Sequence, residues 1–369
     1  MEDLNFGCIY AMTTAAVPEF YPWQTDVARQ WLTERERFAH AWLIHGLSGI
    51  GKTNFALAAA AALLCEKPQG AMACGHCVAC QWVALGNHPD LRRIRPDAVA
   101  ALEGAETEPA EMPVASDDTS ASGKKTLSKE IRVEQLRQLH TWFNTATHRG
   151  GFRVAVIYPA EAMNAIAANA LLKVLEEPPS HTVFLLVADA PDRLLPTLVS
   201  RCRRLPMSVP ARTWCADWLR TQGVDHPDLW LDAAGGAPLK ALVASQEQSS
   251  ACPEWLSQFA QAVLVPGSAD VGPTADALEK IPVSVWVDVM QRWFVDLLLA
   301  VHAAPARYYR SLEKQTAKIA RAAAPQALAD TSRWLGQQRA LADHPLNAKL
   351  LVHTSVQRIM LALAPRQVQ

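Results

Sequence analysis

Short runs of apolar residues alternate with helical patterns over the first 205 residues of the chain. One run, the segment AHAWLIHG, ends at Gly46, and two others cover Arg153–Tyr158 and Val183–Val187. A long pattern rich in Ala and Leu follows the first run, and the helical stretch Asn164–Glu177 separates the other two. Strands that alternate with helices are typical of an α/β fold with a parallel sheet. The sequence therefore predicts an α/β domain that ends near residue 205.

The pattern changes beyond Pro206, where no further strand-like run occurs and Gly and Pro break the chain into helical segments. One face of a predicted helix carries apolar residues at spacings of four, three, four and four: Trp286, Met290, Trp293, Leu297 and Val301. Such a stripe favours helix packing or a subunit contact over a cofactor site. We expect the C-terminal part to be entirely α-helical.

The charges of the 369-residue chain are nearly balanced, with 35 Lys and Arg against 36 Asp and Glu. This balance gives no overall attraction to nucleic acid or to a membrane surface, so any DNA contact must be local. The longest strongly apolar stretch, Phe55–Cys65, is far below the roughly 18 residues of a spanning helix. The N-terminal residues lack the basic stretch of a secretory signal. We expect a cytoplasmic protein, and either Met1 or Met12 as its natural start.

A stretch of different composition, at about residues 97–128, interrupts the predicted α/β domain. Seven acidic residues precede its first lysine, among Ala, Ser, Thr, Gly and Pro without periodicity. This composition predicts a flexible, solvated loop inserted into the domain. An acidic interaction segment is the alternative, and we place no site residue there.

A phosphate-binding loop is predicted between the first strand and the helix that follows it. The residues GLSGIGKT match the pattern G-x-x-x-x-G-K-[ST] in the order strand, loop, helix. In this pattern the glycines let backbone N–H groups surround phosphate oxygens, the lysine meets the β and γ phosphates, and the threonine can bind Mg²⁺. The candidate residues for ATP and Mg²⁺ are Gly46, Gly49, Gly51, Lys52 and Thr53. A loop that is kept only for its shape is the alternative.

The residues needed to hydrolyse ATP are missing from the corresponding strand end. P-loop ATPases need an acid there to hold Mg²⁺ and a residue that positions the attacking water. Here Tyr158 and Pro159 follow the strand, and Glu161, the nearest carboxylate, lies three residues beyond the expected first acid. Tyr158 is a poor Mg²⁺ ligand when neutral, and Pro159 has no acidic group. We predict negligible intrinsic ATPase activity, even if nucleotide binds.

Four of the eight cysteines cluster after the helix of the phosphate-binding loop. Two overlapping C-x2-C pairs in an intracellular chain usually indicate zinc, and four thiolates leave no open position for a water ligand. The predicted structural Zn²⁺ ligands are Cys65, Cys74, Cys77 and Cys80. We do not expect His76 to be a ligand. No basic recognition helix follows, so the cluster predicts a clip on the α/β domain rather than a DNA-binding finger.

Several of these strings together resemble the clamp-loader AAA+ family. They are the phosphate-binding loop, the cysteine knuckle after its helix, the segment NALLKVLEEPP that begins at Asn169, and Ser200-Arg201-Cys202. The resemblance is dense over the first 205 residues and weaker beyond. It implies an AAA+ P-loop domain with a zinc-knuckle insertion (1–205, knuckle about 65–80), a helical lid (206–253) and an all-α C-terminal collar (254–369).

Within that family, the departures from the motor subunits gamma and tau resemble the delta-prime type. The acids after the strand, the sensor threonine and the lid arginine of the motors are replaced here by Tyr158-Pro159, by the segment Val187-Ala188-Asp189 and by Leu239-Lys240. The resemblance implies a stator in a complex with gamma/tau and delta, which loads the β clamp of DNA polymerase III onto primed DNA. It also implies that Arg201 acts as an arginine finger in the ATP site of a neighbouring motor subunit.

Two other functions remain open from the residues alone. An active motor ATPase of the same complex would hydrolyse ATP in isolation. A stand-alone zinc-ribbon protein would bind nucleic acid as a monomer with a steep salt dependence. The missing acids argue against the first alternative, and the near-neutral charge argues against the second.

Overall fold

The computed structural model describes residues 16–33, 38–104, 127–143, 145, 147–148, 151–265, 272–341 and 348–364. The chain divides into two compact units, with the boundary between Trp214 and Cys215, inside the first turn of the helix α9 (Arg212–Thr221). Among the described residues, no helix combines the length and the apolar character needed to cross a membrane. The two units are described one after the other.

The first unit is built on a five-stranded parallel sheet with the strand order β2-β3-β4-β1-β5. The central strands β3 and β4 are buried along their whole length, which explains why each appears in the sequence as an unbroken apolar run. The strands are β1 (Ala41–Gly46), β2 (Leu91–Ile94), β3 (Arg153–Ile157), β4 (Thr182–Ala188) and β5 (Arg203–Met207). The predicted α/β fold with a parallel sheet is confirmed.

The two edge strands, β2 and β5, were not predicted from the sequence. Each is short and carries two arginines, as in the sequences LRRI and RRLPM. Charged side chains are common on edge strands, where they discourage pairing with other chains and obscure the apolar pattern. Both strands therefore lack the signal that identified β1, β3 and β4.

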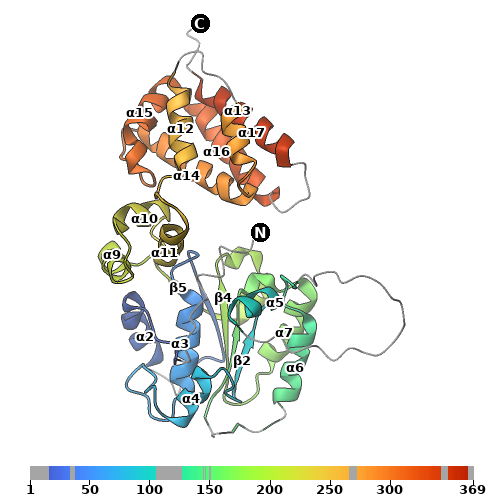
Figure 1. Cartoon of the computed structure of the whole chain (residues 1–369). Coiled ribbons are helices and arrows are strands. Elements are labelled where there is room, and N and C mark those ends of the chain that lie inside the picture. Colours follow the sequence, from blue (N-terminus) through green and yellow to red (C-terminus); the bar gives the residue numbers. More distant parts are fainter. Residues whose placement is uncertain are drawn as a thin grey trace, which may run out of the picture. The chain divides into compact units, whose positions relative to one another are not determined.

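Helices cover both faces of the sheet (Figure 1). Apolar residues of α6 and α7 share one core with alternate residues of β1, β3 and β4, such as Leu43, Ile157 and Phe184. Helix α3 contacts the same three strands, and its buried residues lie outside that core. The helical elements are η1 (Pro22–Gln24), α2 (Thr25–Leu32), α3 (Lys52–Leu64), α4 (Val78–Ala84), α5 (Asp97–Leu102), α6 (Val133–Phe143), η3 (Ala160–Ala162), α7 (Ala165–Glu176), η4 (Pro191–Arg193) and α8 (Pro196–Arg201).

The predicted loop at about residues 97–128 was wrong at its start, which is helical. Residues Asp97–Leu102 form the helix α5, and Glu103, the residue after it, is turned inward. Glu103 forms an ion pair with Arg95, which lies before the helix. The composition of the segment gave no sign of this contact. Residues 105–126 lie outside the described part of the chain.

The second unit is helical throughout its described residues, as expected. Its large core gathers around α14, whose stripe residues Trp286, Met290, Trp293 and Leu297 are fully buried. A smaller core joins α9 to α11. The elements are α9 (Arg212–Thr221), α10 (Pro227–Ala233), α11 (Pro238–Glu247), α12 (Glu254–Val263), α13 (Gly272–Leu278), α14 (Val283–Val301), η5 (Arg310–Leu312), α15 (Glu313–Ala322), α16 (Pro325–Leu341) and α17 (Ala348–Leu363). The division into lid and collar stays a prediction.

Candidate functional site

The phosphate-binding loop lies between β1 and α3, where the sequence placed it. Gly46 ends β1 with a φ of +152°, and a Cβ built on it would lie 2.3 Å from the backbone oxygen of Met207 on β5. Gly51 precedes α3 in the left-handed region, with a φ of +88°. Only glycine fits these two positions, so the loop can turn directly from the strand into the helix. The N-terminus of α3 then offers backbone N–H groups to an anion.

Lys52 is buried at the first position of α3 and points back into the loop. Its Nζ donates to the backbone oxygens of Gly46 and Leu47 at 2.9 and 2.7 Å. A third contact, at 2.5 Å, joins Nζ to Oδ1 of Asp189. Thr53 follows Lys52 on α3 and is half-buried. All five predicted phosphate-loop residues therefore lie together.

An N-terminal segment seals this loop from one side, a role that the sequence analysis missed. Trp23 Nε1 donates to the Ile50 oxygen at 3.0 Å, and the Gln24 amide donates to the Gly51 oxygen at 2.9 Å. The ring of Tyr21 lies close enough to Gly51 that a Cβ there would be 2.7 Å away. The motif Tyr-Pro-Trp-Gln was visible in the sequence, but its contact with a loop about 27 residues away was not.

The end of β3 carries a buried hydrogen-bonded group instead of a metal-binding acid. Tyr158 is fully buried, and its hydroxyl donates to Oε2 of Glu103 at 3.0 Å. Arg95 forms an ion pair with the same oxygen at 2.7 Å. Burial raises the pKa of Tyr158 well above its ordinary value, so its hydroxyl stays protonated. A neutral phenol is a poor ligand for Mg²⁺.

Glu161, the nearest alternative carboxylate, is engaged elsewhere. Its Oε1 accepts a hydrogen bond from the backbone N–H of Ala190 at 2.6 Å. This contact ties the turn after β3 to the turn after β4, because the two strands are neighbours in the sheet. One oxygen of Glu161 is therefore engaged by a backbone donor, and the other, Oε2, is buried without a hydrogen-bond partner among the described residues.

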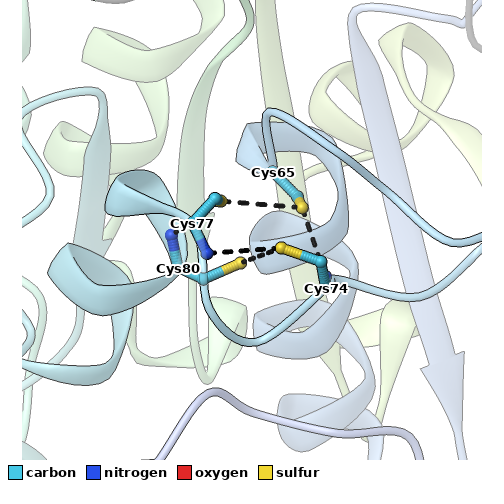
Figure 2. Close-up of side chains that lie close together, drawn as sticks. All are labelled: Cys65, Cys74, Cys77 and Cys80. Atoms are coloured by element: carbon cyan, nitrogen blue, oxygen red, sulfur yellow. Dashed lines mark hydrogen bonds between the residues drawn. The ribbon is translucent and has the colours of Figure 1, made fainter.

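The four clustered cysteines come together between α3 and α4 (Figure 2). Their sulfur atoms all lie within 4.8 Å of one another, and the pairs Cys65–Cys77 and Cys74–Cys80 are each 3.9 Å apart. Tetrahedral coordination by four sulfur atoms, with metal–sulfur bonds of about 2.3 Å, places the sulfur atoms about 3.8 Å from one another. A disulfide bond would require a sulfur–sulfur distance of about 2.05 Å. The four thiols therefore fit a tetrahedral metal ion.

The backbone around the sulfurs favours thiolates at one position. The His76 N–H is the main cause that lowers the pKa of Cys74 to about 6, while burial raises the pKa of Cys65 and of Cys80. Backbone N–H groups also point at sulfur from Cys74, Cys77 and Cys80. The His76 ring turns to the Cys74 carbonyl at 2.7 Å, away from a role as ligand.

Arg201 is the last residue of α8, and its side chain is about a third exposed. One terminal nitrogen donates to the Thr197 oxygen at 2.9 Å. The other pairs with Oε1 of Glu176, at the end of α7, at 2.5 Å. Glu176 belongs to the segment NALLKVLEEPP, so two motifs that are separate in the sequence meet here. The guanidinium is therefore held by two partners without being buried.

Comparison with known proteins adds the family. The profile of the family described as "DNA polymerase III, delta subunit" matches residues 25–210. A Pseudomonas aeruginosa protein named DNA polymerase III subunit delta' is 35% identical over 289 residues, which cover 77% of this chain and 77% of that protein. An Escherichia coli protein of the same name is 33% identical over 65% of each chain.

A more distant relative distinguishes the subunit types. A Mycobacterium bovis protein named DNA polymerase III subunit gamma/tau is 27% identical over 66% of this chain and 39% of its own length. The delta' proteins are thus more similar to this chain and are matched over a larger share of their length. The chain belongs to the delta' family of DNA polymerase III clamp-loader subunits.

Proposed function

We propose that this protein is the stator of the clamp loader and that it assists ATP hydrolysis in a neighbouring motor subunit through Arg201. In this role it assembles with gamma/tau and delta and helps load the β clamp onto primed DNA. The observation that carries the proposal is a partly exposed arginine, in the Ser-Arg-Cys motif, on a chain whose own strand end lacks the catalytic acids. The predicted cytoplasmic location follows from the same role.

The chemistry of Arg201 suits this role. A guanidinium is always charged and offers a planar set of donors that matches the oxygens of a γ-phosphate. Such arginines, supplied by a neighbour, accelerate phosphoryl transfer by roughly 10³- to 10⁵-fold. The Glu176 pair is half-exposed, and exposed pairs of this kind are weak. Arg201 can therefore exchange Glu176 for a more highly charged phosphate at low cost.

The protein's own ATPase activity is negligible in this proposal. Tyr158 is neutral and buried, and Pro159 has no acidic group. Glu161 accepts a hydrogen bond from the backbone N–H of Ala190, after β4. Phosphoryl transfer depends on positioning and on electrostatic stabilisation, and both require the missing acids. A nucleotide held by the phosphate-binding loop would be bound passively.

The metal in the cysteine cluster is Zn²⁺ in this proposal. Four sulfur ligands at tetrahedral spacing select zinc over harder cations and leave no position for a catalytic water. Cys65 directly follows α3, and Cys77 caps α4. The ion would therefore hold the start of α4 against the end of the helix that carries Lys52.

The test is ATP hydrolysis by the reconstituted complex with clamp and primed DNA. Arg201→Ala is expected to lower turnover at the neighbouring site by about a thousandfold or more, within the range for supplied arginines. Arg220→Ala is the matched control, because Arg220 is also exposed and also pairs with a carboxylate, that of Asp217, at 2.5 Å. Lys52→Ala in this chain is expected to leave turnover unchanged.

Two results would contradict the proposal. Unchanged turnover with Arg201→Ala, in a complex that still assembles, would remove the arginine finger. Loss of turnover with Lys52→Ala would instead identify this chain as an active motor. Gel filtration of each variant with its partner subunits checks that the complex is intact.

A further inference from the structure

The hydrogen-bonding capacity of Lys52 is filled from within the chain. An ammonium group has three donors. Those of Lys52 meet three acceptors, the oxygens of Gly46 and Leu47 and the carboxylate of Asp189, at 2.9, 2.7 and 2.5 Å. The Lys52 side chain is only 3% exposed, whereas that of Asp189 is 45% exposed. The lysine that would meet a nucleotide's phosphates is therefore already paired with a carboxylate of the same chain.

The sheet places Asp189 at this position. Strand β4 lies beside β1, and Ala188 pairs with His45 in the parallel register. Asp189 is the next residue after Ala188, so it leaves the carboxyl edge of the sheet beside Gly46, where the phosphate-binding loop starts. Its carboxylate reaches Lys52 across this edge. The contact joins residues 137 apart in the sequence.

The surroundings are otherwise favourable to an anion. The pKa of His45, at the end of β1, is lowered by burial and then by the charges of Arg204 and Lys52. These two cations and the N-terminus of α3 create a positive field around the loop. Asp189 is the one carboxylate that contacts Lys52 among the described residues. It therefore opposes a field that would attract phosphate.

We propose that Asp189 competes with nucleotide phosphates for Lys52 and makes the phosphate-binding loop favour a nucleoside diphosphate over a triphosphate. A lysine in this loop type serves the β and γ phosphates. A nucleotide must displace the carboxylate from Lys52, and the displaced carboxylate stays tethered to the end of β4. A third phosphate adds negative charge beside it. The inference rests on the passive nucleotide site of the proposed function.

Calorimetric titration of the purified full chain with ADP and with ATP, each with Mg²⁺ or with EDTA, tests the proposal. Asp189→Asn keeps the size and a neutral acceptor but removes the charge. It is expected to tighten ATP binding by about tenfold or more, the effect of one charge-assisted hydrogen bond, and ADP binding by less. Asp189→Ala should act in the same direction. Asp192→Asn, a nearby exposed aspartate, is the control and should change neither affinity.

The outcomes separate clearly. ADP binding more tightly than ATP in the wild type, with the difference reduced in Asp189→Asn, supports the proposal. So does binding that appears only in Asp189→Asn and is lost again in the double variant with Lys52→Ala. Equal changes with Asp192→Asn, a wild-type preference for ATP, or no binding by any folded variant overturns it.

The titration is independent of the role as stator. It uses the isolated chain, whereas the Arg201→Ala assay measures hydrolysis by the motor subunit. Loss of the Arg201 effect with intact titration results would remove the stator and keep the competitor. An intact Arg201 effect with no role for Asp189 in binding would do the reverse.

Discussion

Gly51 is subject to two independent constraints at the residue scale. Its φ of +88° lies in the left-handed region, and a Cβ would lie 2.7 and 2.8 Å from ring atoms of Tyr21. Tyr21 cannot easily withdraw, because its ring stacks on Trp23 and its N–H donates to Gln24. The absence of a side chain at Gly51 therefore also lets the N-terminal segment with Tyr21 pack against the phosphate-binding loop.

Gly51→Ala is expected to lower the stability of the first unit by about 3 kcal/mol, the sum of backbone strain and overpacking. Gly104→Ala is the control, because Gly104 has a φ of +70° but no atom within 4 Å of a built Cβ. That variant should lose only about 1 kcal/mol, from strain alone. Chemical denaturation of both variants measures the difference, and equal losses would show that Tyr21 does not restrict this position.

Among the secondary-structure elements, helix α14 carries both an apolar stripe and one buried acid, Asp296. Its Trp and Met side chains fill the core, and Trp293 Nε1 donates to Thr316 on α15 at 3.0 Å. Asp296, only 1% exposed, accepts from the backbone N–H groups of Arg307, Tyr308 and Tyr309 at 2.7 to 3.2 Å. The carboxylate thus holds the segment after α14 in place, because it satisfies donors that no helix or strand serves.

Asp296→Ala is expected to lower the stability of the second unit by about 3 kcal/mol, because it leaves three backbone N–H groups, including that of the buried Tyr309, without their acceptor. Asp288→Ala on the same helix is the control. Asp288 pairs with Arg292 and Arg339 but is partly exposed, so its loss should cost about 1 kcal/mol or less. Thermal unfolding of the two variants tests this order, and the reverse order would refute it.

The whole molecule contains two units with separate apolar cores. The cysteine cluster and the phosphate-binding loop belong to the first unit, and Asp296 belongs to the second. Each unit has an apolar core of its own, which is what a unit needs in order to unfold cooperatively by itself. A change confined to one unit should therefore leave the other almost unaffected.

Calorimetry should resolve two thermal transitions, which respond to different changes. A zinc chelator, or Cys74→Ser with Cys77→Ser, should lower the first unit's transition by several degrees or more and leave the second in place. Asp296→Ala should lower only the second. Elemental analysis should find one zinc per chain before chelation and none in the double variant. A metal-free wild type, or a single transition that shifts with every change, would contradict this picture.

Local patterns were sufficient for the strongest predictions. Unbroken apolar runs identified β1, β3 and β4, and apolar spacing identified the buried face of α14, because burial on both sides or on one side leaves a distinct period in the sequence. The four cysteines were identified by spacing, and their sulfurs do meet. The edge strands β2 and β5 were missed because their arginines hide the apolar pattern.

The amino-acid sequence was enough to predict the α/β fold of the first unit, the helical second unit, the phosphate-binding loop, the cysteine cluster and the missing acids after β3. Each of these depends on residues that are close together in the chain. Three contacts became known only from the folded chain. Asp189 pairs with Lys52, Glu103 accepts a hydrogen bond from the Tyr158 hydroxyl, and Glu176 pairs with Arg201. These contacts join residues 137, 55 and 25 positions apart, and only the order and register of the strands and the packing of helices bring such residues together.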